Sequence, residues 1–178
     1  MANELYTRTN QKLFFAGLAL EAWRSAETAR AMNAQARIQA ERESALFHLY
    51  GAVLGVAHEI AGYYRLPQAG APRVDMLLNA EVLAAAPSPE LAEMVELAQS
   101  PEAWLGRLLA AYAALFQPPS EPKKAKVDPT QPLIQAVNVD DETPDELGNE
   151  ELEAWRKALK ELVPVSYTHL TLPTSDLV

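Results

Sequence analysis

The chain has 178 residues, of which 49% are hydrophobic, and its formal net charge is −9. This length and composition fit one soluble globular domain with a tail. The absence of cysteine excludes disulfides, Cys-ligated zinc, iron–sulfur clusters and a cysteine nucleophile, and it fits a reducing cytoplasm. Most of the negative charge lies in residues 117–151, so the remainder is nearly balanced and lacks the basic surface that general nucleic-acid binding needs.

Helix-forming residues dominate, with abundant alanine and only seven glycines, so we expect an all-α fold. The N-terminus has no basic region followed by an apolar stretch and a cleavage site, and its longest apolar run is broken by Glu21. These features predict a cytoplasmic protein that does not insert into a membrane.

Two long helices are predicted at residues 4–32 and 35–64, with a break at Asn33 in a left-handed conformation. The apolar stripe predicted for the first helix is Phe15, Leu18, Ala22, Ala26, Ala29 and Met32, widened by Leu13, Leu20 and Trp23. The stripe of the second is Ile38, Ala45, Leu49, Ala52, Val53, Val56, Ile60 and Tyr63. A tight turn between them makes an antiparallel hairpin, in which Gly51 and Gly55 allow close approach.

Three shorter helices are predicted after a loop at residues 65–74. The first covers 74–86. The motif Ser-Pro-Glu then occurs at 88–90 and at 100–102, and it places Ser at a helix N-cap and Pro at the first helical position. It predicts helices at 89–98 and 101–116. The fold expected for residues 1–116 is therefore a bundle of about five helices.

The C-terminal third has a different character. Residues 117–149 are rich in Pro and acidic residues and are predicted to form a flexible linker, which contains a short apolar island. An amphipathic helix is predicted at 150–163. The apolar residues of the island and this helix either fold back on the bundle or bind a protein partner. The candidate partner-binding residues are Leu133, Ile134, Val137, Leu152, Trp155, Leu159 and Leu162.

Residues 164–178 are predicted to be a non-native tail. The segment "VSYTHL" back-translates to a DNA sequence that resembles the mosaic end of transposon-based sequencing adapters. The usual continuation of that adapter encodes Thr171, Leu172, Pro173, Thr174 and Ser175. In this frame residue 164 is restricted to Ser, Pro, Thr or Ala, and it is Pro164. We therefore expect the native sequence to end at Val163 in this chain.

Few residues offer catalytic or metal chemistry. His48 and His58 lie ten residues apart on one predicted helix, about 80° apart around its axis, so they cannot share a metal alone. We predict neither a metal site nor a cofactor. The segment "RESALFH" matches the loose Arg-x(4–6)-His pattern of HEPN-type ribonucleases. That resemblance implies that Arg42 and His48 act on an RNA phosphate and 2′-hydroxyl, although Glu43 beside Arg42 would repel phosphate.

The N-terminal half, "MANELYTRTNQKLFFAGLALEAWRSAETARAMNAQARIQAERESALFHLYGAVLGVAHEIAGYYRLP", is similar to small gammaproteobacterial proteins of the domain of unknown function family DUF6586. The resemblance covers about residues 3–116. It implies a cytoplasmic helical protein with no assigned activity and no catalytic residues to transfer.

The sequence leaves the biochemical function open among three hypotheses. The leading one is a non-enzymatic interaction or adaptor module with a protein partner, which includes the possibility of a homo-oligomer. The alternatives are a HEPN-like ribonuclease that uses Arg42 and His48, and a helical bundle that binds a small ligand between its helices.

Overall fold

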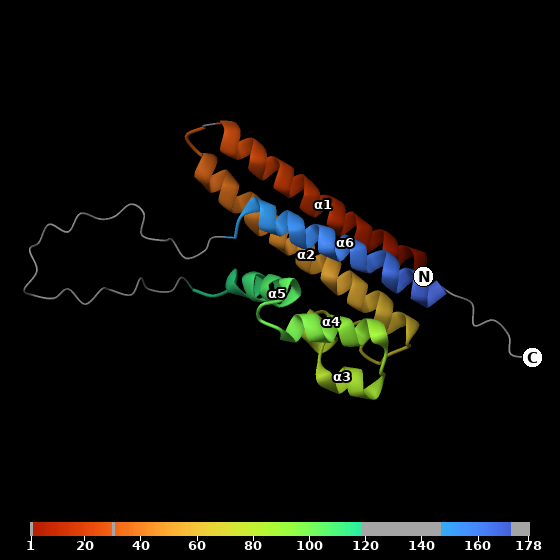
Figure 1. The fold of residues 1–178 in the computed structure, drawn as a ribbon. Coiled ribbons are helices and arrows are strands. Elements are labelled where there is room, and N and C mark those ends of the chain that lie inside the picture. Colours follow the sequence, from red (N-terminus) through yellow and green to blue (C-terminus); the bar gives the residue numbers. More distant parts are fainter. Residues whose placement is uncertain (1, 30, 119–146, 172–178) are drawn as a thin grey trace, which may run out of the picture.

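The computed structural model of the chain describes residues 2–29, 31–118 and 147–171, and this part is entirely helical (Figure 1). Its elements are α1 (Ala2–Ala29), α2 (Ala34–Tyr63), the 3₁₀ turn η1 (Val74–Met76), α3 (Ala80–Ala85), α4 (Pro89–Gln99), α5 (Trp104–Ala114) and α6 (Asn149–Thr171). Helices α1 and α2 form a long antiparallel hairpin, α6 lies along it, α4 and α5 pack beside α2, and α3 packs on α4. The predicted all-α bundle built on an N-terminal hairpin is confirmed.

The core stripe of α1 differs from the predicted one. It consists of Thr9, Leu13, Ala16, Leu20 and Trp23, all buried and spaced alternately by four and three residues. Leu18 lies two residues from both Ala16 and Leu20, which places it about 160° around the helix from each. Leu18 is accordingly 47% exposed, and Met32 at the hairpin tip is fully exposed. Helix α1 carries two overlapping apolar stripes. Its core side is formed mainly by the stripe that contains Leu13, Leu20 and Trp23, which were predicted only to widen the other stripe.

Helices α1 and α2 approach each other closely at Gly55. A Cβ atom at this position would lie 2.4 Å from Thr9 Oγ1, which is too short for any real contact. Thr9 is fully buried, and its hydroxyl donates a hydrogen bond to Glu59 Oε1 at 2.5 Å. The predicted role of Gly55 is confirmed: the absence of a side chain lets α1 bring a buried hydroxyl against α2.

The two ends of α2 are closed in different ways. Asn33 has φ −100° and ψ 16°, so the predicted left-handed conformation is wrong, although the break between the helices is at this point. The left-handed residue is Arg65, with φ 53°. Leu66 N donates to Ala61 O at 2.9 Å and Arg65 N to Gly62 O at 3.2 Å, which is the Schellman arrangement. This arrangement satisfies the last carbonyls of α2 and turns the chain back over the bundle.

The shorter helices begin where a cap is available. The predicted helix at 74–86 is divided into η1 and α3, because the Asn79 side chain accepts a hydrogen bond from Val82 N at 2.9 Å and starts a new helix. Ser88 caps α4 as predicted, accepting from Leu91 N at 3.3 Å. The predicted cap at Ser100 is wrong, and α5 begins at Trp104. The Ser100 carbonyl lies against Gly106, where a Cβ would be 2.0 Å away, so this turn packs on α5 rather than starting it.

Helix α6 extends to Thr171, beyond the predicted end at residue 163. Pro164 has no amide hydrogen and removes one backbone hydrogen bond from the helix. The buried side chain of Val163 holds the helix on the bundle immediately before this position. The predicted linker at 117–149 falls largely outside the described residues, and the adapter origin of residues 165–178 stays a prediction.

We expect Gly55→Ala to destabilise the protein, because the added methyl would force Thr9 and the α1–α2 contact apart. Overpacking of this kind costs about 1–3 kcal/mol, against a gain of up to about 1 kcal/mol in helix propensity. The matched control is Gly62→Ala in the same helix, where the nearest atom to an added Cβ is 3.9 Å away. In urea denaturation, Gly55→Ala should lower the free energy of unfolding and Gly62→Ala should raise it. An equal increase for both variants would contradict the close approach.

Candidate functional site

Helix α6 is fixed to the hairpin by its first residues. Asn149 is buried, and its Nδ2 donates to the Leu20 carbonyl at 2.9 Å while its Oδ1 accepts from Arg24 Nη1 at 3.1 Å. Arg107 of α5 pairs with Glu151 at 2.5 Å and lies 5.8 Å from the centre of the Trp155 ring. These polar contacts set the position of α6 along the groove between the other helices.

The partner-binding residues predicted on α6 are mostly buried within the chain itself. Leu152, Trp155 and Leu159 belong to the hydrophobic core and are at most 3% exposed. Leu162 is half-buried and lines a shallow hollow of about 320 Å³ with Leu97 and other residues. Helix α6 therefore folds back onto its own bundle and does not leave these residues free for a partner. Leu133, Ile134 and Val137 lie outside the described residues.

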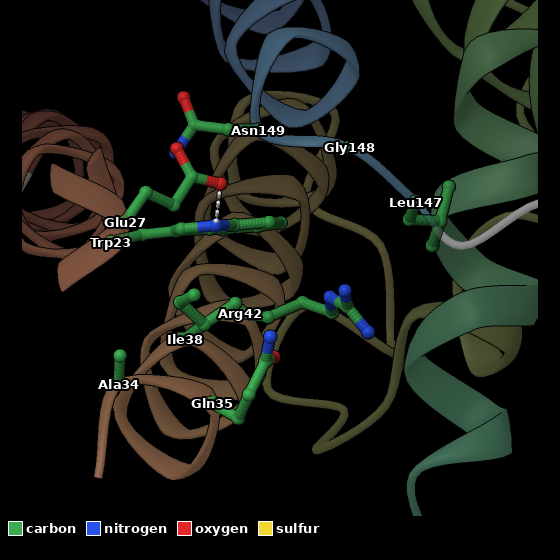
Figure 2. A pocket seen from close by; sticks show the side chains of 9 residues that line it. All are labelled: Trp23, Glu27, Ala34, Gln35, Ile38, Arg42, Leu147, Gly148 and Asn149. Carbon is green, nitrogen blue, oxygen red and sulfur yellow. Dashed lines mark hydrogen bonds between the residues drawn. The ribbon is translucent and has the colours of Figure 1, made fainter. Parts of the chain in front are cut away.

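A pocket of about 460 Å³ opens where α6 begins (Figure 2). Its lining includes Trp23 of α1, Arg42 of α2 and Asn149 of α6. Trp23 Nε1 donates to Glu27 Oε1 at 2.6 Å, and the Arg42 guanidinium lies 5.2 Å from the centre of the Trp23 ring and donates to Gln39 at 3.1 Å. Both ends of the Asn149 amide are also in use. The Trp23 indole, Glu27 Oε1 and the Asn149 amide are thus engaged with the chain itself.

Arg42 and His48 have different surroundings. Arg42 lies at the pocket, whereas the His48 ring packs between Phe15 and Phe47, with centroids 5.3 and 5.4 Å away. Six residues along one helix separate them by about 9 Å and about 120° around the axis. Burial, and secondarily the charge of Lys12, lowers the pKa of His48, so its neutral form is favoured. The structure therefore does not bring the two residues together as a phosphate-binding pair.

The histidines show no arrangement for a metal. His58 Nε2 lies 2.7 Å from the carbonyl oxygen of Ala71 and holds the loop after α2. His48 Nδ1 is buried without a hydrogen-bond partner. Within the part of the chain that the structure describes, no group of three or more His, Cys, Asp or Glu side chains is placed to hold a metal ion.

The feature that remains is an exposed apolar cluster on the hairpin, formed by Phe14, Phe15, Leu18, Phe47 and His48. We call this cluster the outer face. Its rings form a chain of contacts: the Phe14 and Phe15 centroids are 6.3 Å apart, the Phe15 ring is tilted against His48, and His48 contacts Phe47 edge-on. Phe14, Leu18 and Phe47 are 62%, 47% and 52% exposed, respectively. A contiguous apolar cluster of this kind marks an interaction surface more often than scattered apolar residues do.

The family comparison now adds to this geometry. Residues 1–166 match the model of a family of unknown function, DUF6586. The chain belongs to this family. The resemblance seen at residues 3–116 thus extends over most of α6 of the DUF6586 chain. No curated protein and no solved structure matches it.

One described helix of this DUF6586 chain, α2, is long and apolar enough by length and composition to cross a membrane. The same properties belong to a core helix, and α2 supplies ten buried residues, among them Leu49, Val53 and Ile60. It contacts α1, α4, α5, α6 and η1. Its apolar character is therefore explained by its central place in the bundle.

Phe14 and Phe47 were not among the candidate site residues predicted from the sequence. Phe14 follows the core residue Leu13 directly and is about 160° from Ala16, so a stripe centred on Leu13, Ala16 and Leu20 would have placed it outside. The sequence of α1 contains two overlapping apolar stripes, and the outer residues can be recognised only when it is known which stripe packs against α2 and α6. Phe47 likewise lies two residues before a core residue, Leu49, and therefore about 160° from it around α2.

We expect Leu159→Ala to destabilise the protein by about 2–5 kcal/mol, because Leu159 is fully buried between α6 and the hairpin. Met76→Ala is the control, since Met76 is an aliphatic residue that is 46% exposed and should change the free energy of unfolding by no more than about 0.5 kcal/mol. Thermal and urea denaturation measure both. Similar small effects for the two variants would show that α6 is not docked.

The lowered pKa of His48 predicts a stability change in acid. As the pH falls, His48 is protonated in the unfolded chain before it is protonated in the folded chain. The contribution of His48 to the free energy of unfolding is therefore complete above about pH 6.5 and is lost as the pH falls through the lower folded-state pKa. Burial raises the pKa of Glu59, which changes stability in the opposite direction but is common to both proteins compared here. We expect the free energy of unfolding of His48→Gln to decrease less than that of the parent chain between pH 7 and pH 5. Equal pH profiles would contradict the shift.

Proposed function

We propose that this protein is a non-enzymatic, cytoplasmic protein-binding module, and that the outer face is its binding surface. The observation that supports this proposal is the exposure of Phe14, Leu18 and Phe47, each about half exposed or more. Ring contacts through the partly buried Phe15 and His48 join Phe14 to Phe47, and Leu18 lies one helical turn from Phe14. Aromatic anchors at the centre of a surface patch are the usual sources of binding energy in protein interfaces.

The chemistry of the outer face favours a protein partner. The cluster has no carboxylate, and it is flanked by Lys12, whose Nζ lies 5.2 Å from the centre of the Phe47 ring. An apolar surface with one flanking lysine suits another apolar helical surface. It does not suit a phosphate backbone, which needs several cations, and the net charge of −9 points the same way.

The two alternatives have less support. A ribonuclease that uses Arg42 and His48 needs both side chains at one phosphate, and these two lie on different sides of α2. A ligand-binding bundle needs free polar groups in its pocket. The indole of Trp23, the carboxylate of Glu27 and the amide of Asn149 are instead bonded within the chain.

Site-specific photo-crosslinking tests the proposal. Benzoylphenylalanine replaces Phe47 in the full chain, and in a second variant it replaces Tyr63, which is similarly exposed at the far end of α2. On irradiation in cells that express the chain, we expect a discrete protein adduct from position 47 and none from position 63. The adduct should be lost when Phe14→Gln and Leu18→Gln are added. Equal labelling at both positions, or no adduct at position 47, would contradict the proposed function.

A further inference from the structure

We infer that the partner of the outer face is a second copy of this chain, packed hairpin on hairpin about a two-fold axis that crosses α1 and α2 at their midpoints. This inference rests on the proposed function, because it names the partner of the same surface. It is carried by three observations: the place of the cluster along the hairpin, the pairing that this place allows, and the size of the face.

The aromatic cluster lies at the middle of both helices. Helix α1 runs from residue 2 to 29 and α2 from 34 to 63, so their midpoints fall between residues 15 and 16 and between residues 48 and 49. Phe15 and His48 are at these positions, and their ring centroids are 5.3 Å apart. Both midpoints therefore lie at the same level. A two-fold axis at this level brings the cluster of one copy onto the same cluster of the other, as an isologous interface requires.

The most exposed side chains of α1 pair reciprocally under this symmetry. Phe14 and Leu18 are placed on either side of the α1 midpoint, on the face turned away from the core. When a second α1 packs antiparallel across the axis, Phe14 of each copy meets Leu18 of the other. Phe47 lies within two residues of the α2 midpoint and meets the corresponding cluster of the other copy. The same set of residues thus supplies both halves of the contact.

The size of the face supports this partner over a short apolar segment. Burying the exposed parts of Phe14, Leu18 and Phe47 removes roughly 300 Å² from water. This gain does not exceed the loss of translational and rotational freedom on association by much, so the cluster alone would bind weakly. The hairpin face is about 42 Å long, from 28 residues in α1, and about 20 Å wide, which gives roughly 800 Å². A stable interface buries about 800 Å² per partner. A second full-length hairpin supplies this area.

The molar mass in solution is the first test. Sedimentation equilibrium of the purified full chain should give about 39 kDa, twice the 19.5 kDa of one chain. Phe14→Glu with Phe47→Glu should return the mass to that of one chain, since each substitution would place a charge in the contact. Tyr63→Glu is the control and should leave the dimer intact. Circular dichroism confirms that each variant is folded. A monomer at all concentrations in the parent chain would overturn the inference.

Cysteine crosslinking tests the symmetry, because the chain has no native cysteine. Leu18→Cys lies close to the axis and should give a covalent dimer with a short bis-maleimide. Tyr63→Cys is fifteen residues from the midpoint of α2, so its two copies would be about 45 Å apart and should not crosslink. Efficient crosslinking at position 63 but not at position 18 would overturn the proposed arrangement.

The results separate this inference from the proposed function. A chain that is monomeric in sedimentation but forms a position-47 adduct with another protein would keep the proposed function and overturn the second copy as partner. A monomeric chain with no adduct at position 47 would overturn both. A dimer that dissociates in the Phe14 and Phe47 variants, together with a position-47 adduct of dimer mass, would support both.

Discussion

The contact between Thr9 and Gly55 sets the geometry on which the rest of the bundle depends. It places a buried hydroxyl of α1 directly against the backbone of α2, with Glu59 accepting its hydrogen bond. This close approach fixes the register of the hairpin, because every other α1–α2 pair follows at helical spacing from it. The register then decides which side chains lie in the groove that receives α6 and which lie on the outer face.

Helix α6 completes the core that the hairpin begins. Its buried residues Leu152, Trp155 and Leu159 fill the groove between α1 and α2, while Asn149 bonds to the Leu20 carbonyl at its entrance. A buried amide is costly without partners, and here both ends are satisfied, so the contact specifies where α6 starts. An amphipathic helix at the end of a long tether can resemble a partner-binding segment in sequence. In this chain the apolar side of that helix is buried by the same polypeptide.

Much of the fold could be predicted from helical periodicity and caps, and the errors have physical causes. The hairpin and the Ser88 cap follow from strong local signals. Ser100 carries the same motif as Ser88, but its carbonyl packs on Gly106, and that tertiary contact overrides the local preference. The outer face was missed because α1 carries two overlapping apolar stripes. Only the packing of α2 and α6 decides between them, and no residue of α1 alone indicates it.

Folding alone does not account for the outer face. Exposed positions contribute little to the free energy of folding, so polar residues at Phe14, Leu18 and Phe47 would leave the bundle about as stable. Isolated exposed apolar side chains are ordinary, but Phe14 and Phe47 are joined through Phe15 and His48 into one surface at the centre of the hairpin, and Leu18 lies one helical turn from Phe14. Helix α6 covers the groove side of this hairpin, α4 and α5 pack beside α2, and α3 packs on α4 (Figure 1). The cluster lies on the part of the hairpin that these helices leave uncovered. The fold neither needs this surface for its stability nor covers it, and the proposed second copy of the chain would cover it.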